Sequence, residues 1–443
     1  MANKRSRKRN NPKLIIAIAV IVAVIVIAII ILWCVKPQLF HKYLGVGKHE
    51  WSEWQVTQAD CGNNGSKKRE CKTCGEEDKQ VITATGEHDF GDDGICKVCG
   101  FDGRTPSEAS LEEVAESDLS IHFLELGNKY TGDCTLIKCG DTEVLIDAGS
   151  RQNSATTIKS YVDQYCTDGV LEYVIATHAH QDHIAGFVGS NSGNTKTGIL
   201  YQYKVGTLIQ FSGTNATSQI YNNYLTAVEY AKEQGATVYT AKQCWYETDG
   251  AQKTYYLDEA QKISLNILYQ RYYDELDKND ENNYSVCTLL TQVTENKTYN
   301  YLFTGDLEAE GESSLVENNN LPEVELFKGG HHGSYTASTE KLLSVIKPKN
   351  VAVCCCCGTT EYTSNKDNTF PAQAFIDRVS KYTENMYCTT LMIDYKAGTY
   401  ESMNGNIVFY YRKEESALKL YCSNNSTILK DTEWFRQNRV WKG

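Results

Sequence analysis

The chain has 443 residues, of which 41% are hydrophobic and 23% are charged. A single core rarely grows past about 250–300 residues, so this length predicts more than one unit of ordinary globular composition. The formal net charge of −12 disfavours a general binder of polyanions, because such binding depends on Lys and Arg side chains that neutralise phosphates.

The first segment, residues 1–35, has the pattern of a membrane anchor. Six basic residues precede an uninterrupted apolar run over residues 14–35, which is long enough to cross a bilayer as a helix. More Lys and Arg precede the run than follow it, which places the N-terminus in the cytoplasm. We predict a cytoplasmic basic tail and a single-pass transmembrane signal anchor, with the rest of the chain extracytoplasmic; a cleaved signal peptide is the alternative.

Residues 36–48 are predicted to form a stalk, and residues 49–103 a small Cys-rich module. Two Cys-x-x-Cys pairs, each followed by Gly, lie about twenty residues apart and predict one structural Zn²⁺ in a zinc-ribbon-like module. The four predicted ligands are Cys71, Cys74, Cys96 and Cys99. Two disulfides are the alternative, because the predicted location permits them. The stretch GEHDFGDDGICKVCG resembles cysteine-pair modules repeated in surface proteins of some Gram-positive bacteria.

Residues 104–119 are polar and acidic and are predicted to be a linker. From residue 120 onward, short β-like runs alternate with expected helices over residues 152–165 and 217–234. This alternation, with many hairpins, favours an α/β sandwich over a doubly wound parallel sheet. The run of four cysteines, Cys354 to Cys357, reads as a buried strand, with a redox role as the alternative. A C-terminal tail over residues 416–443 is expected to pack on the domain edge or to contact lipid or polysaccharide.

The segment THAHQDHIAG carries the chemistry that the sequence makes clearest. His178, His180, Asp182 and His183 follow the expected strand over residues 171–177. A tight loop after a strand can aim the first two histidines at one ion and the last two residues at a second. Imidazole and carboxylate ligands suit Zn²⁺, Mn²⁺ or Fe.

This HxHxDH pattern resembles the signature of the metallo-β-lactamase superfamily. Further residues stand in the family's order, namely Asp147 in EVLIDAG, Asp306 in YLFTGDLE, and His331 and His332 in LFKGGHHGS. The stretches IHFLELGNKYTGDCTLI, ENNYSVCTLL, FTGDLE and LFKGGHHGS resemble the extracytoplasmic domain of ComEC-type DNA-uptake proteins. The resemblance covers the catalytic domain alone and implies an αββα sandwich over residues 120–415.

The resemblance also implies roles for these residues around two Zn²⁺ or Mn²⁺ ions. His178 and His180 would hold the first ion. Asp182 and His183 would hold the second together with one histidine of the HHGS pair, for which we favour His331. Asp306 would bridge the ions, and Asp147 would orient their ligands. The remaining histidine and Ser334 are candidate catalytic or anion-binding groups, and Lys328 is either a further anion contact or a surface lysine.

One departure from the family pattern concerns the first ion. No His occurs from residue 184 to residue 330, and Asn282, Asn283 and Ser285 stand in the matching stretch. Amide oxygen is a poorer zinc ligand, so this ion site is expected to be weak, completed by water, or empty. The two asparagines are then candidate substrate contacts.

The implied activity is metal-dependent hydrolysis of a phosphodiester by a bridging hydroxide, with nucleic acid or a cell-wall polymer as substrate. A phosphorylcholine or teichoic-acid esterase, or another ester or lactone hydrolase, is the alternative within this class. A non-catalytic surface binding module with a degenerate metal site is the alternative of another class. The sequence identifies no protein partner.

Overall fold

The computed structural model describes residues 49–59, 65–82, 89, 97–98, 111–192, 195–276, 280–414 and 417–443. The chain divides into two compact units, Met1–Asp102 and Gly103–Gly443. The predicted anchor over residues 1–35 and the stalk over residues 36–48 lie outside the described residues. Among the described residues, no helix is both long enough and apolar enough to cross a membrane.

The described part of the first unit is a three-stranded antiparallel sheet in the order β1-β2-β3. Its strands are β1 (Gln55–Thr57), β2 (Gly65–Glu70) and β3 (Glu77–Ile82). Cys71 and Cys74 lie in the turn between β2 and β3, whereas Cys96 and Cys99 lie outside the described residues. The four-thiolate zinc site therefore stays a prediction.

The second unit contains two eight-stranded mixed sheets. The first has the strand order β11-β10-β7-β6-β5-β4-β20-β21. Its strands are β4 (Leu119–Phe123), β5 (Thr135–Cys139), β6 (Thr142–Ile146), β7 (Val170–Ala176), β10 (Lys204–Gln210), β11 (Thr237–Thr240), β20 (Ile407–Arg412) and β21 (Ala417–Cys422). Strands β6, β7, β10 and β11 run parallel, and the remaining pairs are antiparallel.

The second sheet has the order β12-β13-β14-β15-β16-β17-β18-β19. Its strands are β12 (Thr254–Tyr256), β13 (Ile263–Leu268), β14 (Cys287–Val293), β15 (Thr298–Phe303), β16 (Leu326–Lys328), β17 (Val351–Cys357), β18 (Met386–Asp394) and β19 (Thr399–Ser402). Every residue of β17 is buried, so the four cysteines lie in an interior strand, where Cys packs as a small apolar residue.

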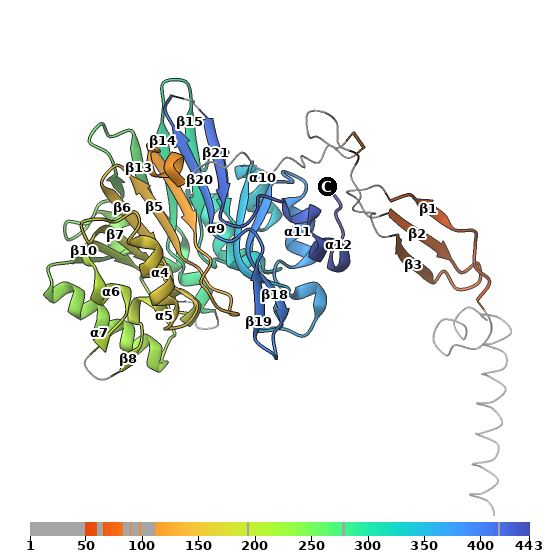
Figure 1. Cartoon of the computed structure of the whole chain (residues 1–443), viewed down its shortest axis with the longest axis horizontal. Helices are drawn as coiled ribbons and strands as arrows, with labels where there is room; N and C mark the ends of the chain where they lie inside the picture. Colours follow the sequence, from red (N-terminus) through yellow and green to blue (C-terminus); the bar gives the residue numbers. More distant parts are fainter. Residues whose placement is uncertain are drawn as a thin grey trace, which may run out of the picture. The chain divides into compact units, whose positions relative to one another are not determined.

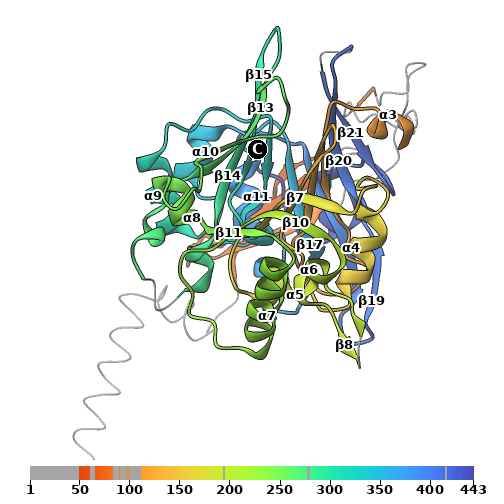
Figure 2. The same cartoon turned by 90° about the vertical axis from the view of Figure 1, so that its left-hand side faces the viewer.

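Helices flank both sheets (Figures 1 and 2). On the first sheet lie α4 (Ser154–Val162), α5 (Gln181–Val188), α6 (Ile199–Gln202) and α7 (Gln219–Glu233); on the second lie α9 (Ala309–Asn318), α10 (Glu340–Ile346) and α11 (Gln373–Val379). Further short α-helices in the described residues are α3 (Leu111–Ala115), α8 (Ala241–Tyr246) and α12 (Glu433–Asn438). Phe123 of β4 packs against Phe303 of β15 with ring centroids 6.3 Å apart, which joins the two sheets. The predicted mixed α/β fold with a layered core is thus confirmed.

The C-terminal tail is part of this unit. Strand β21 extends the edge of the first sheet by pairing with β20. Phe435 is buried in the apolar core of the second sheet, and the Arg439 guanidinium donates hydrogen bonds to the carbonyls of Pro371 and Thr369 at 2.9 and 2.7 Å. Because these bonds and this core residue belong to the sandwich itself, the tail packs on the domain, which is one of the two readings of the sequence.

Candidate metal centre

Ionisable residues gather where several strands of the two sheets end. Asp147 follows β6, His178 follows β7, Asp306 follows β15 and His332 follows β16. Asp133 and His183 join Asp306 and His332 at this place. Ligand atoms of these four residues all lie within 4.8 Å of one another, and all four residues are buried. Segments separated by up to about two hundred residues therefore meet in one small volume.

Asp306 lies at the centre of this cluster. Its Oδ2 is 3.0 Å from His183 Nε2 and 3.2 Å from His332 Nε2. Burial alone would raise the pKa of Asp306, but the positive charges of His183 and His332 hold that pKa well below its usual range. A carboxylate facing two imidazoles in this way can share its oxygens with a cation.

His183 is oriented by Asp147. Asp147 Oδ2 lies 2.8 Å from His183 Nδ1, which leaves Nε2 directed at Asp306. The Asp147 carboxylate is itself held by the backbone amide and the hydroxyl of Thr177, at 2.8 and 2.7 Å. A carboxylate that fixes the tautomer and direction of a histidine is the usual support for a metal ligand.

The two histidines of the HHGS segment occupy different environments. His332 is buried; its Nδ1 is 2.9 Å from the Cys354 carbonyl, and its Nε2 faces Asp306. His331 is partly exposed, its Nε2 is 3.9 Å from Asp306, and its Nδ1 is 3.2 Å from Glu308 Oε1. Both have positive φ angles of 47° and 54°, so the backbone turns between them and the side chains diverge. The structure thus places His332 in the cluster, whereas the sequence favoured His331.

The other residues of the HxHxDH segment lie next to the cluster. His178 is buried, and its ring centroid is 4.1 Å from that of His183. His178 Nε2 is 3.0 Å from Nδ1 of the exposed His180. Asp182 Oδ2 lies 3.4 Å from His332 Nε2. All four residues of the motif therefore lie at one edge of the sandwich, with His180 toward solvent.

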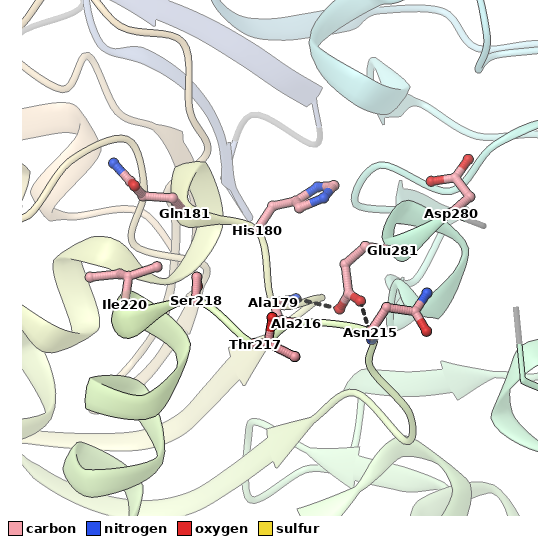
Figure 3. A pocket seen from close by; sticks show the side chains of 10 residues that line it. All are labelled: Ala179, His180, Gln181, Asn215, Ala216, Thr217, Ser218, Ile220, Asp280 and Glu281. Atoms are coloured by element: carbon pink, nitrogen blue, oxygen red, sulfur yellow. Dashed lines mark hydrogen bonds between the residues drawn. The ribbon is translucent and has the colours of Figure 1, made fainter. Parts of the chain in front are cut away.

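A buried glutamate holds the loop that carries these residues. Glu281 accepts hydrogen bonds from the backbone amides of Ala179 and Asn215, at 3.2 and 2.5 Å (Figure 3). It also accepts one from the Thr214 hydroxyl at 2.8 Å. An open pocket of about 580 Å³ lies beside this loop. It is lined by Ala179, His180, Gln181, Asn215, Ala216, Thr217, Ser218, Ile220, Asp280 and Glu281. His180 points into the pocket in this view, so the pocket adjoins the histidine that faces solvent.

Several residues predicted as substrate or anion contacts bond to other protein groups in the structure. Asn283 Oδ1 accepts from the Glu308 amide at 3.3 Å, and Asn282 Nδ2 donates to the Glu308 carboxylate at 3.4 Å. Ser334 Oγ accepts from the Thr336 amide at 3.2 Å. The surface reading of Lys328 is wrong: the residue is 3% exposed, and its ammonium pairs with Asp133 and lies 3.6 Å from Asp306 Oδ1.

Three residues that contact the predicted site residues were not predicted from the sequence. Asp133 pairs with Lys328 and lies 3.1 Å from His332 Nδ1. The Tyr362 hydroxyl donates to Asp182 Oδ2 at 2.8 Å, and Glu308 contacts His331. Asp133 stands in the quoted stretch YTGDCTLI, so its place just before a buried strand was a usable signal. Tyr362 lies in a loop without any motif and offered none.

The donor set fits a divalent cation. Within the part of the chain that the structure describes, the buried atoms Asp306 Oδ1 and His332 Nε2 make no hydrogen bond, although charged groups lie 3.2 to 3.6 Å from them. Buried polar atoms are rarely left without a partner unless an ion or water completes them. Imidazole nitrogen and carboxylate oxygen suit Zn²⁺ and Mn²⁺. These residues can therefore hold such an ion. The ammonium of Lys328 forms an ion pair with Asp133 and so balances part of the negative charge of the site.

Comparisons with known proteins agree with the motif. Residues 127–189, which include Asp147 and the whole HxHxDH segment, match the family model described as the metallo-β-lactamase superfamily. No curated protein matches the chain.

Three solved structures of metallo-β-lactamases have a low similarity to this chain. The metallo-β-lactamase SMB-1 is 13% identical, with 47% of this chain and 75% of that chain covered and a TM-score of 0.28. A metallo-β-lactamase from an Alaskan soil metagenome, LRA-12, is 15% identical, with 42% and 63% covered and a TM-score of 0.25. The subclass B3 metallo-β-lactamase MEM-A1 from a soil metagenome is 10% identical, with 48% and 80% covered and a TM-score of 0.28. The family match covers residues 127–189 alone, and within that segment the HxHxDH residues and Asp147 lie together at one edge of the sandwich.

Proposed function

We propose that this chain is a membrane-anchored, extracytoplasmic, metal-dependent hydrolase that cleaves phosphodiesters. The observation that carries the proposal is the placement of the Asp306 carboxylate, 3.0 Å from His183 and 3.2 Å from His332 at a buried edge of the sandwich. Hydrolases that work with paired ions commonly use a carboxylate at such a centre. The ComEC-like stretches of the sequence support a phosphodiester as the substrate class.

The residues divide into two ligand groups. His183, His332, Asp182 and Asp306 would hold one divalent ion, and His178 and His180 would contribute to a second beside it. Bound ions at this place supply a Lewis acid for the phosphoryl oxygens and a water of lowered pKa. Asp147 keeps His183 Nε2 directed at the centre through its 2.8 Å contact with Nδ1.

His331 is placed to handle a proton. It is not among the four clustered residues, and its Nδ1 contacts Glu308 at 3.2 Å while its ring remains 20% exposed. A histidine held by a carboxylate at the mouth of a site can protonate a leaving oxygen. Tyr362 donates a hydrogen bond to Asp182 from the exposed side and so steadies a ligand at the same mouth.

The pocket beside His180 narrows the substrate class. Among the residues that the structure describes, its lining contains amides, hydroxyls and the carboxyl groups of Asp280 and Glu281, but no Lys or Arg. Affinity for nucleic acid depends on cationic contacts to successive phosphates, and the described part of this lining contains no Lys or Arg that could make them. We therefore favour a small phosphodiester that carries a neutral or cationic substituent, such as a phosphorylcholine ester, over a nucleic acid.

Turnover of two chromogenic substrates tests the proposal. The full-length protein is stripped of metal, reconstituted with Zn²⁺ or Mn²⁺, and assayed on bis(p-nitrophenyl) phosphate and p-nitrophenyl phosphorylcholine, with Asp182→Ala beside it. We expect metal-dependent turnover that is lost in the variant, with the choline ester preferred. Asp141→Asn, a change in an exposed turn, is the control and should retain full activity.

The other outcomes are equally decisive. Metal binding without turnover of either substrate would contradict a phosphodiesterase and direct the search to carboxylic esters and lactones. Failure to bind metal would support a surface binding module with a degenerate site. Preference for DNA or RNA over the choline ester would leave the chemistry intact and overturn the assignment of the substrate.

A further inference from the structure

A second group of metal-ligating side chains lies in the small unit, far along the sequence from the centre described above. Ligand atoms of His49, Cys71 and Cys74 lie within 4.8 Å of one another. We propose that His49, Cys71 and Cys74 form a structural zinc site of their own, so that a histidine replaces a thiolate of the Cys96–Cys99 pair as the third ligand.

The distances between the ligand atoms suit one ion. His49 Nδ1 lies 3.7 Å from Cys74 Sγ. Zinc holds sulfur at about 2.3 Å and nitrogen at about 2.0 Å, and a tetrahedral angle between them separates the two atoms by about 3.5 Å. The observed separation therefore needs almost no adjustment to receive the ion.

The histidine also has the support that a metal ligand needs on its second nitrogen. Nε2 of His49 lies 3.7 Å from Glu76 Oε2, which is on the opposite side of the ring from the sulfur. A proton held on Nε2 by this carboxylate would place the lone pair of the ring on Nδ1, the nitrogen nearest the Cys74 sulfur. Trp51 stacks on the ring with centroids 4.9 Å apart and limits its rotation.

Backbone contacts bring the two segments together. The Lys72 amide donates to the Glu50 carbonyl at 2.8 Å, and Trp51 pairs with Cys71 as an isolated β-bridge. The Cys71 amide donates to the Glu76 carbonyl at 2.8 Å, which closes the turn that carries both cysteines. Gly75 has a φ of 71° and closes the turn, with its amide donating to the Cys71 carbonyl at 2.9 Å.

The sequence supplies an independent parallel. GKHEW precedes the pair in CKTCG, and GEHDF precedes the pair in CKVCG. Each Cys-x-x-Cys pair thus follows its own Gly-x-His-acidic-aromatic segment. This arrangement is what two separate histidine-containing sites would require, and a single pooled four-thiolate site gives no reason for it.

Cobalt substitution of the full-length protein tests the site. Thiolate ligands give Co²⁺ a charge-transfer absorption that the nitrogen and oxygen ligands around Asp306 cannot give, so the readout ignores that centre. We expect the absorption to persist in the double variant Cys96→Ser/Cys99→Ser. In that background, His49→Ala should weaken Co²⁺ binding by about 10-fold or more, and Glu76→Gln by about 10-fold. Glu50→Ala, an exposed neighbour whose carbonyl contact is retained, is the matched control and should change nothing.

Two results would overturn the proposal. Loss of the absorption in the double variant would establish a pooled four-thiolate site, and an absorption that ignores His49→Ala would remove histidine from the ligand set. If His49→Ala fails to fold, His49→Cys provides the second variant. It should restore folding and strengthen the charge-transfer absorption, and failure to do so would count against the site.

Discussion

The two candidate metal sites of this chain are built in opposite ways. The centre around Asp306 draws its residues from the ends of β6, β7, β15 and β16, and two large apolar cores hold those strands. The site around Cys71 lies on a three-stranded sheet in which every residue of β1 is exposed. A large core can hold ligands in place before an ion arrives, whereas a unit with little core relies on the ion for its stability.

Metal removal should produce the largest difference in stability between the two units. Structural zinc contributes about 10–16 kcal/mol in small zinc-binding domains, so chelation should unfold the small unit and spare the sandwich. Hydrogen exchange of the full-length protein, with and without a chelator, provides the measurement. We expect the amides of β2 and β3 to lose protection and those of β6 and β7 to keep it. Equal loss in both units would show that the comparison is wrong.

Substitution of the central carboxylate should stop catalysis without unfolding the sandwich. Metal ions contribute several kcal/mol to the transition state, so Asp306→Asn should lower kcat/KM by about 10³-fold. Turnover of the preferred substrate and circular dichroism measured together check this. Asp141→Asn is the control, and an active Asp306→Asn would exclude Asp306 from the site.

A smaller effect is expected from the residue behind His183. Asp147→Asn keeps the shape but weakens the contact to His183 Nδ1, and losses of such support lower metal affinity or activity by about 10–100-fold. Competition with a chromophoric chelator measures the affinity directly. Unchanged affinity together with unchanged kcat would assign Asp147 to turn geometry alone, since its φ is 59°.

The smallest effect concerns a buried histidine of the sandwich that lies outside the metal centre. His122 is fully buried between the Tyr161 hydroxyl and Ser120 Oγ, each 2.8 Å away. Burial lowers the pKa of His122 to about 3, whereas the unfolded chain titrates near its ordinary pKa of about 6.5. The unfolded state therefore binds the extra proton first, so stability is complete above about pH 6.5 and falls by up to about 1.4 kcal/mol per pH unit below it. Urea unfolding at pH 7 and pH 5 should show a smaller loss for His122→Gln than for the native chain, and equal losses would refute this.

The sequence predicted the chemistry of the sandwich better than its arrangement. The HxHxDH segment, Asp147 and Asp306 could be predicted as site residues, because metal ligands of fixed type follow strands at fixed spacing. The choice between His331 and His332 could not be made from spacing, because it depends on positive φ angles at both residues. The burial of Lys328 was missed for a related reason: its partner Asp133 is nearly two hundred residues away and only the packed sheets bring them together. In the small unit, local pairs revealed the cysteines, but the histidine 22 residues before Cys71 required the backbone pairing of Trp51 with Cys71.

Anomalous X-ray scattering at the zinc edge, from crystals of the full-length protein grown with Zn²⁺, tests the central claim most directly. The account predicts one set of peaks within bonding distance of His183, Asp306 and His332, and a separate peak bonded to His49, Cys71 and Cys74. Zinc at the second place alone would contradict the metallohydrolase. Zinc shared by all four cysteines of the two pairs, with His49 unbound, would contradict the contrast between the two sites.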